Sequence, residues 1–150
     1  MITIINHQRD TLTFKSYEAL LSYEHYNYIL RINCSNNNLT YLPCLPSTLI
    51  GLNCFYNNLN TLPSLPSTLT DLNFSNNNLT YLPSLPSTLT YLNCSYNNLT
   101  YLPSLPSTLI ELNCSCNNLN TLPSLPTNLK RLYASSNKLT YLPKLPKELI

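Results

Sequence analysis

The sequence predicts a solenoid of short parallel strands, made of coils of about 20 residues that stack on one another. A 20-residue pattern recurs six times between Ile29 and Glu148. Within each copy, apolar and polar residues alternate over a short run, which is typical of a half-buried strand. Each copy also carries a Leu-Pro-x-Leu-Pro segment, whose prolines exclude a helix interior. A fixed short period indicates a stack of similar coils, each held by its neighbours.

Residues 1–28 differ in composition from the repeats, and we interpret them as an N-terminal cap. The segments Ile2-Thr-Ile4 and Leu12-Thr-Phe14 alternate like strands, with a turn over residues 7–10 between them. The apolar spacing that follows predicts one short helix over roughly residues 15–25. The alternative for this region is a separate segment that docks a peptide.

The repeats are expected to follow the cap directly, with a truncated end at Leu149-Ile150. They occupy residues 29–48, 49–68, 69–88, 89–108, 109–128 and 129–148. Counted within a copy, apolar residues fall at positions 1, 4, 6, 11, 14 and 17. Positions 3 to 6, for example 91–94, predict a strand that pairs in parallel with its neighbours at a spacing of about 4.8 Å. The Leu-Pro pairs predict an extended or polyproline II return, with little helix after residue 30.

Asparagine recurs at two positions of the repeat, for which we expect different roles. Position 9 lies where the strand turns, and an inward amide there can satisfy backbone groups left over at the bend. This structural ladder comprises Asn37, Asn57, Asn77, Asn97, Asn117 and Asn137. Position 5 points away from the core, so its amides are expected to bond along the stack or to form the floor of a binding surface. These residues are Asn33, Asn53, Asn73, Asn93 and Asn113.

The cysteines are interpreted as free thiols. Position 6 holds Cys34, Cys54, Cys94 and Cys114, while Phe74 and Ala134 take the same place in the other copies. A position that accepts all three residue types is a small apolar core site. Cys44 and Cys116 replace polar residues and are expected to be exposed. Free thiols fit a reducing compartment, and neither a secretory signal nor a membrane-spanning segment is recognisable, so we expect a cytoplasmic protein.

The pattern Leu-x-x-Leu-x-Cys-x-x-Asn-x-Leu, followed by x-x-Leu-Pro-x-Leu-Pro, resembles the leucine-rich repeat. Its length and Leu-Pro pairs are similar to the short bacterial-type subclass of secreted bacterial effectors, and comparable arrays occur in giant-virus repeat proteins. The resemblance implies an α/β-type leucine-rich repeat solenoid whose strands line a concave face that holds protein partners. It would place the protein in the cytoplasm of a host cell. Some effectors add a catalytic ubiquitin-ligase domain, to which nothing in these 150 residues corresponds.

Positions 3, 7 and 8 contain the residues that differ between copies and are expected to face outward. An exposed aromatic group beside charges is a plausible protein anchor, whereas unselected drift on a tolerant surface is the alternative. The candidate partner-binding residues are Arg31, Phe55, Tyr56, Asp71, Tyr91, Tyr96, Glu111 and Arg131. We therefore expect a protein-interaction scaffold, with end-to-end self-association of a structural repeat protein as the alternative.

Catalysis, cofactors and metals are not expected. The only histidines, His7 and His25, lie in the cap, and Cys114-Ser-Cys116 lacks the second ligand pair of a zinc site. With one glycine the chain has no glycine-rich phosphate loop, and no small-molecule substrate is indicated. A net charge of +2 is too small to indicate a nucleic-acid partner. The basic residues near the C-terminus are interpreted as a solvated end.

Overall fold

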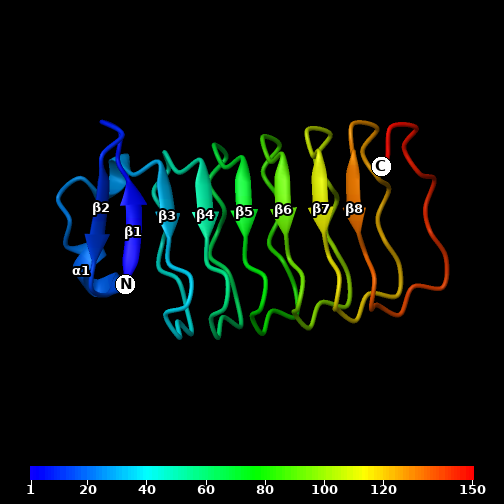
Figure 1. Cartoon of the computed structure of the whole chain (residues 1–150), viewed down its shortest axis with the longest axis horizontal. Coiled ribbons are helices and arrows are strands. Elements are labelled where there is room, and N and C mark those ends of the chain that lie inside the picture. Colours follow the sequence, from blue (N-terminus) through cyan, green and yellow to red (C-terminus); the bar gives the residue numbers. More distant parts are fainter.

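All eight strands belong to one sheet, in the order β2-β1-β3-β4-β5-β6-β7-β8 (Figure 1). The structure is a computed structural model that describes residues 1–150. At the N-terminal end, β1 (Ile2–Ile5) pairs antiparallel with β2 (Thr11–Phe14) and with the first repeat strand. The repeat strands are β3 (Arg31–Asn33), β4 (Gly51–Asn53), β5 (Asp71–Asn73), β6 (Tyr91–Asn93), β7 (Glu111–Asn113) and β8 (Arg131–Tyr133).

The repeat strands are parallel and in register. Every residue pairs with the residue 20 positions further along, as Leu72 does with Leu92. Positions 4 and 6 point inward, and Leu92 and Cys94 are fully buried. Positions 3 and 5 point outward, and we call the surface that they form on β3 to β8 the strand face. The predicted parallel solenoid is confirmed, and its regular strands end one residue earlier than the range 91–94 that the alternation indicated.

The return half of each coil is extended, as the proline pairs predicted, and no helix follows Tyr28. Threonines at position 20 tie successive returns together. The Thr88 hydroxyl lies 2.7 Å from the carbonyl oxygen of Ser67 and 2.8 Å from that of Leu69, the two carbonyls that flank Thr68. Thr48, Thr68 and Thr108 repeat this arrangement. In the fifth coil Asn128 takes the place of threonine and donates only one such bond, to the carbonyl oxygen of Ser107. Successive returns are therefore less firmly connected toward the C-terminus.

The N-terminal segment closes the first coil. Its helix α1 (Tyr17–Leu21) is shorter than the expected range 15–25 and is followed by a 3₁₀ helix, η1 (Tyr26–Tyr28). The Ser16 hydroxyl accepts a bond from Ala19 N, whereas Ser22 turns back to bond the Glu18 carbonyl and ends the helix. Side chains of the segment, among them Ile2, Ile4 and Leu20, join the core of 29 buried residues.

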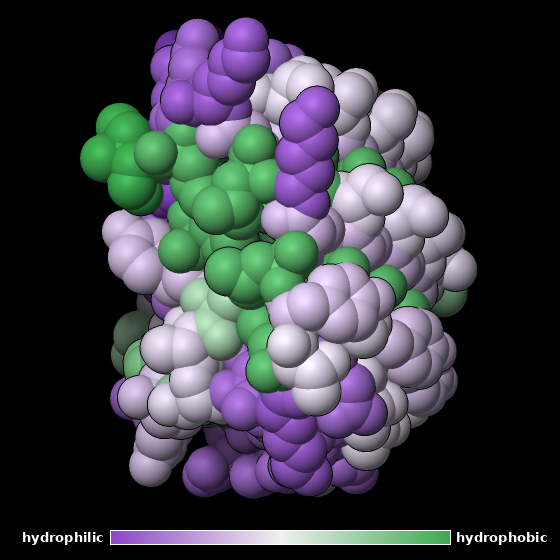
Figure 2. All heavy atoms as spheres, turned by 90° about the vertical axis from the view of Figure 1, so that its right-hand side faces the viewer, coloured by the Kyte–Doolittle hydropathy of each residue, from purple (hydrophilic) through white to green (hydrophobic).

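The opposite end of the stack leaves apolar side chains uncovered. Leu142 is 55% exposed, whereas Leu122, its equivalent one coil earlier, is 5% exposed. Leu145 and Ile150 are exposed beside it. Figure 2 shows this end as an apolar patch flanked by hydrophilic residues. We call these three residues the apolar end.

Candidate functional site

Position 3 places six residues in a row across the strand face, and five of them carry a side chain. The row runs Arg31, Gly51, Asp71, Tyr91, Glu111 and Arg131 in register. Its four charged members form two ion pairs. Arg31 Nη2 lies 3.2 Å from Asp71 Oδ2, and Arg131 Nε lies 2.6 Å from Glu111 Oε2. The Glu111 carboxylate holds the pKa of the Arg131 guanidinium above its usual value. Both carboxylates of the strand face are thus neutralised by a partner on the same face.

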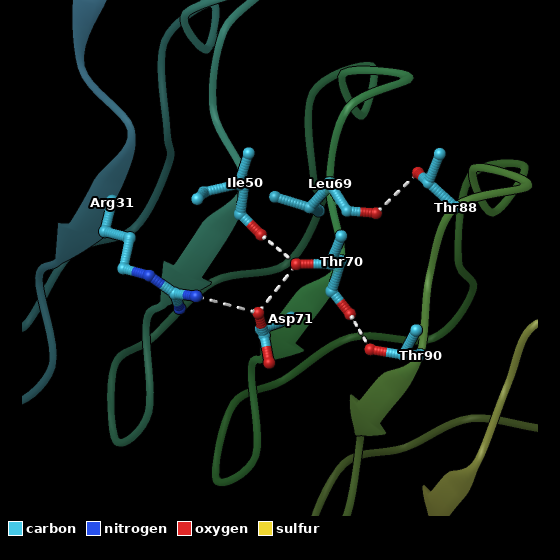
Figure 3. A network of polar contacts seen from close by, with 7 residues as sticks. All are labelled: Arg31, Ile50, Leu69, Thr70, Asp71, Thr88 and Thr90. Atoms are coloured by element: carbon cyan, nitrogen blue, oxygen red, sulfur yellow. Dashed lines mark hydrogen bonds and ion pairs between the residues drawn. The ribbon is translucent and has the colours of Figure 1, made fainter. Parts of the chain in front are cut away.

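Asp71 is held by a second contact at the edge of its strand (Figure 3). The Thr70 hydroxyl lies 2.7 Å from Asp71 Oδ2 and 2.9 Å from the carbonyl oxygen of Ile50, so its single proton is shared between the two acceptors. Thr90 repeats the backbone contact one coil later, at 3.0 Å from the carbonyl oxygen of Thr70. The carboxylate is therefore held by Thr70 of its own coil and by Arg31, two coils earlier.

The strand face has a hollow of about 450 Å³ at its N-terminal half. Arg31, Asp71 and Tyr91 line it from position 3, and Thr3 and Thr11 of the N-terminal hairpin form its end wall. The amides of Asn33, Asn53 and Asn73 also line it. Three of the eight sequence-predicted binding residues therefore meet around one concavity, with uncharged amides beside them.

The amides at position 5 all have the same orientation. In each, Oδ1 accepts the backbone N–H of the residue two positions later, at 3.0 to 3.1 Å. Serine hydroxyls at position 7 of three coils donate to the same oxygens. This is an Asx-type turn, in which the side chain imitates a backbone carbonyl. The bonds do not run along the stack, so the ladder expected for position 5 does not form, and these side chains belong to the floor of the strand face.

Tyr56 and Tyr96 lie apart from the strand-face row. Position 8 has a left-handed backbone in all six coils, with φ of 54° at Tyr56 and 53° at Tyr96. The two rings, 57% and 58% exposed, flank a recess of about 380 Å³ lined otherwise by asparagines of positions 8, 9 and 10. Phe55 packs against Tyr56 with ring centroids 5.8 Å apart. The predicted binding residues thus fall into two surfaces, the strand face and this loop edge.

The position 9 amides connect neighbouring coils from the inside. Asn77 Nδ2 lies 3.0 Å from the carbonyl oxygens of Cys54 and Phe74, and its Oδ1 accepts Leu59 N at 2.9 Å. Asn57, Asn97, Asn117 and Asn137 make equivalent bonds. At the first coil, Asn37 instead contacts the main chain of Met1. These side chains hold the coils together and are not available to a partner.

The six cysteines are free, and the four at position 6 are buried. Burial raises the pKa of Cys34 and Cys114 to about 12, and it raises the pKa of Cys54 and Cys94 well above its usual value. All four are protonated at neutral pH and are therefore poor nucleophiles. Cys44 is exposed as expected. Cys116 is half-buried rather than exposed, because it lies beside Tyr96, whose pKa it raises.

The structure contains no cluster of three or more His, Cys, Asp or Glu side chains that could hold a metal ion. The two histidines lie near each other in the cap, with ring centroids 6.2 Å apart. None of the helices has the length and apolar character needed to cross a membrane.

The in-register strands, the extended returns and the asparagine ladder define a leucine-rich repeat protein of the short bacterial type. The LRR domain of a Shigella effector is similar to this chain, with a TM-score of 0.76 and 43% identity over 77% of the chain. YopM from Yersinia enterocolitica has a TM-score of 0.75 and 32% identity over 83% of the chain. The leucine-rich effector YopM from Yersinia pestis has a TM-score of 0.72 and 35% identity over 79%.

The chain spans 53% of the Shigella domain, 32% of the Yersinia enterocolitica YopM and 40% of the Yersinia pestis YopM. No protein-family model and no curated protein matches the sequence. The comparisons therefore establish the repeat class and its fold. Repeat solenoids of this class generally act as protein-interaction scaffolds, through the extended surface that their stacked coils create.

Proposed function

We propose that this protein is a non-catalytic scaffold that binds a partner protein on the strand face. The observation that carries the proposal is the hollow around Arg31, Asp71 and Tyr91, where an aromatic ring lies beside oriented charges and amides. Aromatic and arginine side chains within a concave surface are the residues that most often dominate protein interfaces.

Position-specific cross-linking tests this assignment. A photoreactive phenylalanine analogue is placed at Tyr91 on the strand face, at Tyr96 on the loop edge and at Tyr101 on the return side. We expect the adduct with a captured partner to form from position 91, with position 101 as the negative control. Adducts from position 101 without any from position 91 would show that the partner binds the other side of the coil.

Self-association through the apolar end is the second candidate, favoured by the exposure of Leu142, Leu145 and Ile150. The outer edge of β8 also leaves backbone groups unpaired, and such edges readily accept another strand. Light scattering over a concentration series distinguishes the candidates. Growth in mass that disappears in a Leu142→Lys/Leu145→Lys variant supports association, whereas a constant monomer mass contradicts it.

We propose a cytoplasmic location, because the six thiols are free and two of them are at least partly exposed. Reducing compartments keep such thiols unpaired. Cell fractionation with trapping of free thiols tests this, and a protein recovered with oxidised Cys44 from an extracellular fraction would contradict it.

A further inference from the structure

Five asparagine side chains on the strand face all direct their NH₂ groups toward solvent. The side chains at position 5 use only their Oδ1 atoms within the protein, and their Nδ2 groups donate no hydrogen bond. They belong to Asn33, Asn53, Asn73, Asn93 and Asn113. The orientation is fixed by chemistry, since the backbone N–H that each side chain receives can be accepted by an oxygen and not by an NH₂ group. The strands are in register, so the NH₂ groups form a row about 4.8 Å apart.

No unpaired negative charge near this row would repel an anion. Asp71 and Glu111 are the only carboxylates at positions 3 and 5, and each is paired with an arginine. The strand face therefore offers ten unused amide protons, two on each of the five asparagines, and no unpaired carboxylate. Donors in such excess are best satisfied by groups that only accept, which among protein side chains are the carboxylates of Asp and Glu. A lysine-rich segment finds no free acceptor of comparable strength on this face.

We propose that the strand face recognises a segment of its partner protein that is rich in Asp and Glu and crosses the repeat strands. Its carboxylates accept hydrogen bonds from successive Nδ2 groups, and the hollow beside Arg31 and Tyr91 receives one end of the segment. This inference rests on the proposed scaffold function and names the chemistry of the partner. Flexible acidic side chains can reach donors 4.8 Å apart even though an extended chain rises about 3.3 Å per residue.

The test uses blocked hexaglutamate and hexalysine peptides as probes and the ¹⁵N-labelled chain as receptor. We expect hexaglutamate to shift the side-chain NH₂ resonances of the position 5 asparagines, and hexalysine to leave them in place. Equal shifts with both peptides would overturn the proposal. Shifts confined to the surroundings of the C-terminal lysines, Lys130, Lys138, Lys144 and Lys147, would overturn it as well.

A matched pair of variants separates donor loss from added charge. Asn73→Asp/Asn93→Asp replaces two NH₂ donors by oxygens and keeps the oxygen that accepts the turn N–H, so the fold is retained. Asn98→Asp/Asn118→Asp adds the same two charges at position 10, outside the strand face. Because each lost bond to a carboxylate weakens binding about tenfold or more, hexaglutamate should bind the first variant at least about 100-fold more weakly. The control should change the affinity less than about twofold, and an equal loss in both variants would contradict donor recognition.

Failure of the acidic-segment proposal can be distinguished from failure of the scaffold proposal. If the partner cross-links from position 91 while hexaglutamate leaves the amides unmoved, the scaffold function is supported and the acidic-segment inference is wrong. If no adduct forms from position 91, the binding surface itself has been misassigned.

Discussion

Arg31 pairs with Asp71 across an intervening strand because Gly51, on that strand, has no side chain to block the Arg31 guanidinium. A Cβ atom at Gly51 would lie 2.5 Å from Arg31 Nη1 and 3.2 Å from Arg31 Cγ. The φ of Gly51 is not positive, so this position has no need of glycine for its backbone. The only glycine of the chain therefore serves to let the guanidinium pass.

Replacing Gly51 by alanine should separate this ion pair. The added methyl group displaces the Arg31 side chain, which is flexible and half-exposed, rather than the strand. The free energy of unfolding should change by less than about 1 kcal/mol, since an exposed pair contributes little and alanine restricts the unfolded chain. A crystal structure of the variant and urea unfolding measure both effects. An Arg31–Asp71 distance still near that of the parent would contradict the role assigned to Gly51.

Asn77→Ala should destabilise the stack by about 2–4 kcal/mol. The substitution leaves the buried carbonyls of Cys54 and Phe74 and the N–H of Leu59 without partners, and buried unsatisfied groups are costly. Asn137→Ala is the control, because Asn137 is only half-buried and water can replace part of its bonds. Its effect should be about half as large or less, measured by denaturant unfolding. Equal losses in the two variants would show that burial does not set the cost.

Tyr96→Asn should stabilise the protein by about 0.5–1 kcal/mol. A bulky side chain is disfavoured at φ near 53°, whereas asparagine adopts the left-handed region more readily and occupies position 8 at Asn76. The reverse change, Asn76→Tyr, should cost a similar amount. Thermal unfolding of both variants checks the sign. A destabilised Tyr96→Asn would mean that the ring makes contacts that outweigh the backbone strain.

Stability should fall as the pH rises above about 8.5. Burial raises the folded pKa of Cys34 and Cys114 to about 12 and that of Cys54 and Cys94 well above its usual value. The unfolded chain therefore releases these protons first and is stabilised at alkaline pH. Each thiol contributes a slope of about 1.4 kcal/mol per pH unit between its unfolded and folded pKa. A Cys54→Ala/Cys94→Ala variant should show a shallower decline, measured by urea unfolding between pH 8 and 10. Alanine is suited to this position, because Ala134 occupies it in the sixth coil. Parallel declines in parent and variant would assign the effect to other groups.

The repeat and its inward positions could be predicted from the sequence because the same pattern of apolar residues occurs in six successive copies. Leucine or isoleucine at position 4 and an apolar residue at position 6 recur at strand spacing, as Leu92 and Cys94 show, and both of these are buried. The prolines excluded helix from the return for a reason that is local to the backbone. Periodic, local signals of this kind require no knowledge of distant contacts.

Features that depend on neighbouring coils could not be predicted in the same way. The left-handed backbone at position 8 separates Tyr96 from Tyr91, although five residues of sequence suggested one shared surface. Cys116 is half-buried because Tyr96 of the adjacent coil covers it. Helix α1 ends at Leu21 because Ser22 caps it, whereas apolar spacing alone extended it to residue 25. The outward direction of the position 5 amides follows from turn bonds that the sequence shows only as a recurring asparagine, with serine two residues later in four of the five copies.

The in-register pairing of the strands determines which insertions and deletions the protein can accept during evolution. Inserting or deleting one whole 20-residue unit leaves each remaining strand facing an equivalent neighbour, because the strands pair residues one period apart. The surface can therefore grow or shrink in steps of about 4.8 Å without new chemistry. An insertion of a single residue within a strand is not tolerated in this way, since it would turn the leucines of that coil toward water.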